Sequence, residues 1–163
     1  MQKETLFLKV VIIALALAVL TGCIFAVPGL IQAGNDFNSH YRYVFYGGAV
    51  GVTSTATSTA ILFWIIIWQA FKILILIDHD NAFSQTTIKI LRLIKWLAVA
   101  MGVVYALELP SLYVLADHMD APGVLMIGII LTGASIVISV FAALLEKLLA
   151  NAVNYKSEND LTI

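Results

Sequence analysis

Residues 121–145 read APGVLMIGIILTGASIVISVFAALL, a run of 25 residues that contains no charged side chain. A helix that crosses the hydrocarbon core of a bilayer needs about 20 apolar residues, so this run is long enough to form one. Similar uncharged runs occupy residues 10–27 and 43–71, and a further apolar run, interrupted only by Glu108, occupies residues 96–116. We therefore predict an all-α fold, a bundle of four transmembrane helices joined by short loops, at about 6–27, 47–77, 91–115 and 122–150.

The composition of the 163-residue chain agrees with a membrane protein, since 61% of its residues are hydrophobic and 12% are charged. Soluble domains have about 45–50% and about 25%. The net charge of -1 lacks the basic excess of proteins that bind nucleic acid directly. Because the sequence offers no nucleophile and base set, no phosphate loop and no metal-ligand spacing, we expect no enzyme, no cofactor and no metal site.

The cations are distributed unequally between the predicted loops. Eight of the nine lie at the chain ends or around the central loop, and Arg42 alone lies on the other side. The eight are Lys3, Lys9, Lys72, Lys89, Arg92, Lys95, Lys147 and Lys156. Cytoplasmic loops carry an excess of Lys and Arg, so we expect a multi-pass protein of the bacterial plasma membrane with both termini, including the tail 151–163, in the cytoplasm.

The N-terminal run permits a second interpretation. Leu20-Thr21-Gly22-Cys23, after Lys3 and Lys9, resembles the lipobox of a bacterial lipoprotein signal peptide, whose cleavage would leave three helices. Against this, the apolar run continues through residues 24–27 to Pro28. We expect the first helix to be retained.

Glu108 is the one acid or base deep inside a predicted span. Counted from the cytoplasmic end of its helix at about 1.5 Å per residue, it lies in the outer half of the bilayer. Hydroxyl groups are expected near this height on the other helices, and with Glu108 they form a predicted polar layer of Thr21, Thr57, Thr132 and Ser135. The hydroxyls either bond to their own helices and serve packing, or line an outward-open pocket with Glu108 at its base.

Two further sets of residues are candidates for contacts in the cytoplasm. Lys89, Arg92 and Lys95 form a basic stripe that suits either anionic lipid headgroups or an acidic partner. The polar tail, with Lys156, Glu158, Asn159 and Asp160, is either a frayed terminus or a segment that becomes ordered on a partner.

The sequence resembles the small bacterial membrane proteins of domain-of-unknown-function family 2975. The resemblance rests on Asp80-Asn81 with Phe83-Ser84, on Asp120 to Gly123, on Val140 to Leu149, and on the tail Lys156 to Ile163. Members of this family are four-helix membrane proteins that are often encoded beside a short helix-turn-helix regulator. The resemblance therefore implies a membrane protein that binds such a regulator in the cytoplasm.

Taken together, these features favour a non-enzymatic membrane protein with a regulatory or sensory role. Its partners would be the lipid bilayer and a cytoplasmic helix-turn-helix regulator, and small-residue faces would permit a homo-oligomer. The alternative is a small-molecule or proton-coupled transporter, or a bacteriocin-type immunity protein. Glu108 would be central to transport, and the tail to regulation.

Overall fold

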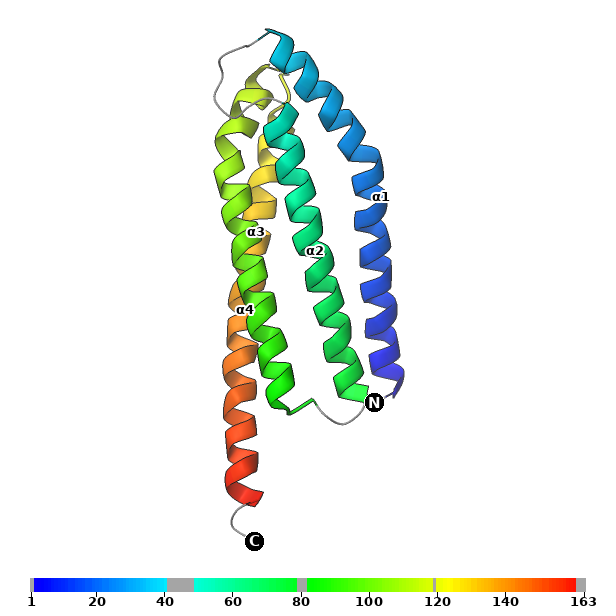
Figure 1. Cartoon of the computed structure of the whole chain (residues 1–163), viewed down its shortest axis with the longest axis vertical. Helices are drawn as coiled ribbons and strands as arrows, with labels where there is room; N and C mark the ends of the chain where they lie inside the picture. The colour runs from blue at the N-terminus through cyan, green and yellow to red at the C-terminus, as the bar shows by residue number, and fades with distance from the viewer. Residues whose placement is uncertain (1, 41–48, 79–81, 119, 161–163) are drawn as a thin grey trace.

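In the computed structural model the chain forms four long helices (Figure 1). The structure describes residues 2–40, 49–78, 82–118 and 120–160. The helices are α1 Gln2–His40, α2 Ala49–Asp78, α3 Gln85–His118 and α4 Pro122–Asp160, and the described part of the chain contains no strand. Each helix contains a segment that is long and apolar enough to cross a membrane, which confirms the all-α fold with four spans.

The four helices alternate in direction, so the start of α1, the end of α2, the start of α3 and the end of α4 lie at one end of the molecule (Figure 1). We call this the terminal end and the opposite one the distal end. Packing follows the chain order: α1 contacts α2, α2 contacts α3, and α3 contacts α4 most extensively. Among the described residues, α1 does not contact α3 or α4.

The helices are longer than the predicted spans. α1 continues through Pro28 to His40, α3 begins at Gln85 rather than near 91, and α4 continues beyond 150 to Asp160. Hydropathy detects only the segment that lies in lipid, whereas intrahelical hydrogen bonds can continue into polar flanks. Pro28 was expected to end the first helix, but a proline removes only one N–H donor and is tolerated inside membrane helices.

Local capping explains where α3 begins and ends. The Ser84 hydroxyl accepts a hydrogen bond from the Thr87 backbone N–H at 3.3 Å, as the residue at a helix N-cap does. At the other end Asp120 has a φ of 49°, and the Ala121 N–H donates to the Ala116 carbonyl at 2.9 Å. This arrangement is typical of a Schellman-type helix end and returns the chain tightly into α4.

Small residues bring α3 and α4 together. A Cβ added at Gly128 would lie 2.5 Å from Leu112 Cδ1, and one at Gly102 would lie 3.4 Å from Ser135 Cβ. Gly128, Ser135 and the buried Ala142 follow each other at intervals of seven on α4. Residues seven apart share a helix face, so this series forms one side of a closely packed interface.

α1 is held less closely than the other helices. Its only contacts in the described part of the chain are with α2, including an ion pair between Lys9 and Asp78 near the terminal end. Large apolar side chains such as Phe7 and Phe25 are exposed on it. In a membrane, lipid tails would cover these side chains, as they would the outer faces of α3 and α4.

The Cys23 side chain falls outside the described residues. The mass of the membrane-extracted protein tests cleavage before Cys23.

Candidate functional site

Glu108 is buried between α2 and α3, with a relative exposure of 9%. Its Oε2 accepts a hydrogen bond from the Thr55 hydroxyl of α2 at 2.8 Å. Its Oε1 is buried and has no hydrogen-bond partner within the described part of the chain. A carboxyl group deep in a span is thus only half satisfied, and such a group is costly in an apolar environment.

The heptad spacing of α3 directs Glu108 towards α2. Ile94 and Leu115 lie fourteen residues before and seven residues after Glu108, and both are buried. Positions separated by multiples of seven share a helix face, so Glu108 lies on a buried face of α3, which Thr55 of α2 contacts. Thr55, in turn, lies one turn from the buried Thr59 on α2.

The other residues of the predicted polar layer bond to their own helices. The Thr21 hydroxyl donates to the Leu17 carbonyl at 2.8 Å, and the Thr57 hydroxyl to the Ser54 carbonyl at 3.3 Å. On α4, Thr132 donates to the Gly128 carbonyl and Ser135 to the Leu131 carbonyl. The structure therefore does not join these four hydroxyls to Glu108.

Thr55 is the partner that sequence reasoning missed. It belongs to the same hydroxyl-rich stretch as the predicted Thr57, two residues along. A shift of two residues turns a side chain by about 200° around a helix. The position of a residue along the helix axis predicts which hydroxyls lie level with Glu108. It does not predict which of them points towards Glu108.

A second buried glutamate joins α3 to α4 nearer the terminal end. Glu146 Oε1 accepts from Arg92 Nε at 2.7 Å, and its Oε2 accepts from Lys95 Nζ at 2.6 Å. Both carboxylate oxygens are therefore paired with cations. Lys89, the third member of the predicted basic stripe, is exposed and makes no ion pair with a described residue.

This pairing leaves Lys89 as the member of the basic stripe that makes no ion pair with a described residue. Arg92 and Lys95 bind an acid of the same chain, although the Arg92 side chain retains 61% of its exposure. The sequence itself contains a signal that could have identified Glu146. In a tight antiparallel hairpin, residues equally distant from the turn face one another, and Glu146 is about as far from residue 120 as Arg92 and Lys95 are.

Two tryptophans lie at matching heights on α2 and α3. Trp68 follows Thr55 by 13 residues on α2, and Trp96 precedes Glu108 by 12 residues on α3. Because Thr55 and Glu108 are hydrogen-bonded to each other, the two tryptophans lie at nearly the same height along the bundle. Lys72 Nζ lies 5.9 Å from the centre of the Trp68 ring, and Lys95 Nζ lies 5.8 Å from that of Trp96. Exposed tryptophans beside lysines are typical of the boundary between hydrocarbon and headgroups.

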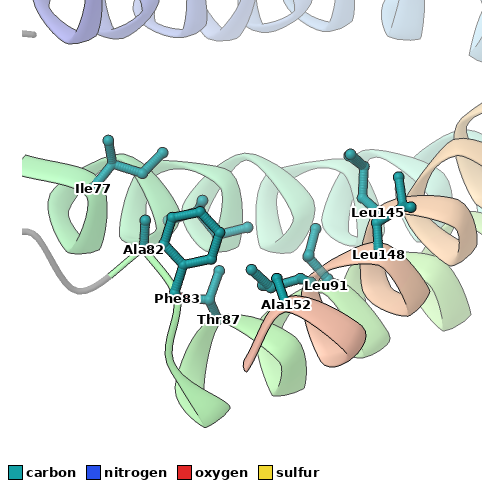
Figure 2. Close-up of a pocket in the computed structure, with 10 residues that line it drawn as sticks. Ile77, Ala82, Phe83, Thr87, Leu91, Leu145, Leu148 and Ala152 are labelled. Atoms are coloured by element: carbon teal, nitrogen blue, oxygen red, sulfur yellow. The ribbon is translucent and has the colours of Figure 1, made fainter. Parts of the chain in front are cut away.

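An apolar groove with a volume of about 440 Å³ lies between α2, α3 and α4. Figure 2 shows the side chains that surround it, with Phe83 of the connection beside Ala82 and Thr87. The groove lies on the terminal side of the two tryptophans, because its α2 and α3 residues come after Trp68 and before Trp96. The lining residues are Ile73, Ile77, Ala82, Phe83, Thr87, Leu91, Leu145, Leu148, Leu149 and Ala152.

The tail residues proposed as partner contacts belong to the last turns of α4. The helix includes Lys156, Glu158, Asn159 and Asp160, but their side chains lie outside the described residues. The groups of His, Cys, Asp and Glu that the structure describes include no cluster of three that could hold a metal ion.

A family model, described as a protein of unknown function (DUF2975), matches residues 29–163. The chain belongs to this family. It is also similar to the uncharacterized membrane protein YoaS of Bacillus subtilis (strain 168). The two are 40% identical over 162 residues, which cover 99% of each chain. No solved structure matches the chain significantly.

The similarity and the four apolar helices agree that this member of the DUF2975 family is a multi-pass membrane protein. The family assignment confirms the resemblance found in the sequence.

Proposed function

We propose that this protein is a non-enzymatic regulator or sensor of the bacterial plasma membrane that binds a soluble helix-turn-helix protein. The observation that supports this proposal most is the apolar groove between α2, α3 and α4. The terminal end, where the groove lies, faces the cytoplasm in this proposal, because eight of nine cations lie at that end or in the segments leading to it.

The two tryptophans indicate that the groove lies outside the hydrocarbon layer of the membrane. If Trp68 and Trp96 mark the cytoplasmic boundary of the hydrocarbon, the last ten residues of α2 and the first eleven of α3 extend about 15 Å beyond it. Apolar side chains in that part of the molecule face headgroups or water. An apolar surface exposed to water is characteristic of a protein interface.

The shape of this region suits a helix of the partner. α4 projects beyond the ends of α2 and α3 at the terminal end (Figure 1). Leu148 and Tyr155 on it are 65% and 68% exposed. An amphipathic helix can place apolar residues in a groove of this kind, and a helix-turn-helix protein is made of such helices.

Co-purification with a short helix-turn-helix protein, which the family resemblance leads us to expect beside the gene, tests the proposal. Leu148→Glu places a charge in the groove, whereas Asn151→Glu places the same charge on an exposed α4 residue outside the lining. We expect Leu148→Glu to reduce capture about tenfold or more, which corresponds to about 1.4 kcal/mol. Equal capture by both variants would contradict the use of the groove.

Deletion of residues 156–163 tests the tail separately. We expect it to abolish or strongly weaken capture, since the last turns of α4 adjoin the groove-lining Ala152. If the deletion variant captures the helix-turn-helix protein as well as the full chain does, the tail is not part of the interface. This result would not contradict the role of the groove.

A second candidate function is a small-molecule or proton-coupled transporter, or a bacteriocin-type immunity protein. The half-satisfied carboxyl of Glu108 supports transport in particular, because intramembrane acids commonly serve as proton relays. A transport phenotype that is lost in Glu108→Gln and unchanged in Leu148→Glu would favour this function over regulation.

A further inference from the structure

The charge of a Glu108 carboxylate has no counterpart among the described side chains. α2 carries no charged residue between Ser54 and Phe71, and Lys72 lies about 25 Å along the helix from Thr55. On α3 the nearest cation is Lys95, about 20 Å away, and the nearest titratable groups are Tyr105, Tyr113 and Asp117.

The remaining helices do not supply a cation either. α4 carries no charged residue from Pro122 to Leu145, and α1 contacts only α2 in the described part of the chain. Glu146 provides the comparison within the same molecule, because it is equally buried and is held by Arg92 and Lys95. A buried carboxylate requires such compensation, or it must be neutralised in another way.

We propose that Glu108 and Thr55 form a binding site for one small monovalent cation, either a proton or a sodium ion. The free, buried Oε1 of Glu108 provides the binding atom, and the Thr55 hydroxyl holds Oε2 in place. A proton would convert the carboxylate to a carboxylic acid without needing further space. A sodium ion would need additional oxygen ligands, and the Thr55 hydroxyl, 2.8 Å from Oε2, is one candidate.

The position of the site gives the cation a structural effect. Glu108 lies about 18 Å from the Trp96 level, deep in the bilayer, and its hydrogen bond joins α2 to α3. Loss of the cation would leave a charged group in the contact between these helices. Binding would therefore change how firmly α2 and α3 are held together, independently of any partner at the groove.

Infrared spectroscopy of the full chain in phosphatidylcholine vesicles tests the site directly. The wild-type minus Glu108→Gln difference spectrum isolates the bands of the Glu108 carboxyl, and the amide preserves the side-chain shape. A bound proton gives the C=O band of a carboxylic acid that disappears at high pH. A bound sodium ion gives carboxylate bands that shift when N-methylglucamine replaces sodium.

Two variants complete the experiment. Thr55→Val removes the hydroxyl that donates a hydrogen bond to Oε2. We therefore expect the infrared band of the Glu108 carboxyl to shift to the frequency of a carboxyl group that lacks this hydrogen bond. Asp117→Asn alters an exposed acid at the distal end of α3, and we expect it to leave the Glu108 bands unchanged.

Carboxylate bands that are insensitive to sodium at every pH would overturn the proposal. An altered Glu108 band in Arg42→Gln would also overturn it, because the chain itself would then supply the compensating charge. Melting of the vesicle-bound protein gives an independent readout: the dependence of Tm on pH or sodium should be reduced in Glu108→Gln and retained in Asp117→Asn.

Discussion

Glu108 and Glu146 are equally buried at 9% relative exposure, yet they differ in how their charge is compensated. Sequence reasoning identified Glu108 because it is alone within a long apolar run. It overlooked Glu146 because that residue lies at the edge of a run, where an acid looks like the start of a polar flank. Burial at such an edge depends on which cations face it, and this depends on the register of the α3–α4 hairpin.

Glu146→Gln is expected to destabilise the protein, because Arg92 and Lys95 would lose the anion between them. We expect a loss of about 1–3 kcal/mol in the free energy of unfolding, less than for a fully enclosed pair because Arg92 remains largely exposed. Thermal unfolding in nanodiscs measures it. Lys147→Gln, at the next and exposed residue, is the control, and equal melting of both variants would contradict this role of Glu146.

At the level of the helices, the apolar runs were sufficient to predict the number of spans but not their ends or their contacts. Pro28 lies inside α1 and α4 extends to Asp160, because a helix ends where its backbone hydrogen bonds end and not where hydropathy falls. The small residues Gly128 and Ser135 lie seven positions apart in the sequence and therefore share one face of α4. Their partners Leu112 and Gly102 could not be predicted, since contacts depend on helix rotation as well as on composition.

Gly128→Ala tests the close approach of α3 and α4. The new Cβ would lie 2.5 Å from Leu112 Cδ1 and 3.2 Å from Leu109 Cδ2, so these flexible side chains would have to move. We expect a loss of stability of about 1–3 kcal/mol. Gly133→Ala on the same helix is the matched control, because its Cβ meets nothing within 4 Å and alanine favours the helix. A Gly128→Ala protein as stable as Gly133→Ala would show that this contact does not limit packing.

For the molecule as a whole, the helices are arranged in chain order, with α1 attached to α2 alone among the described residues. This arrangement leaves α1 and the outer faces of α3 and α4 open to lipid, so the bilayer takes the place of the further protein layer that a soluble fold would need. Helices of 30 to 39 residues also exceed the hydrocarbon core, which about 20 residues cross. The helix residues that extend beyond the core at the terminal end line the groove, and those at the distal end lead to the turn at Asp120.

The difference between the terminal and distal ends also predicts how the whole molecule is oriented in the membrane. Eight cations lie towards the terminal end, and both Trp–Lys pairs lie on that side of Glu108, so we expect the terminal end in the cytoplasm. In a Cys23→Ser background, Gly123→Cys at the distal turn should react with a membrane-impermeant thiol reagent in intact cells. Tyr155→Cys should react only after the cells are opened. Both new cysteines would be exposed on the protein, so a difference in labelling reports the side of the membrane and not burial. The reverse labelling pattern would place the groove outside the cell, where a cytoplasmic regulator could not reach it.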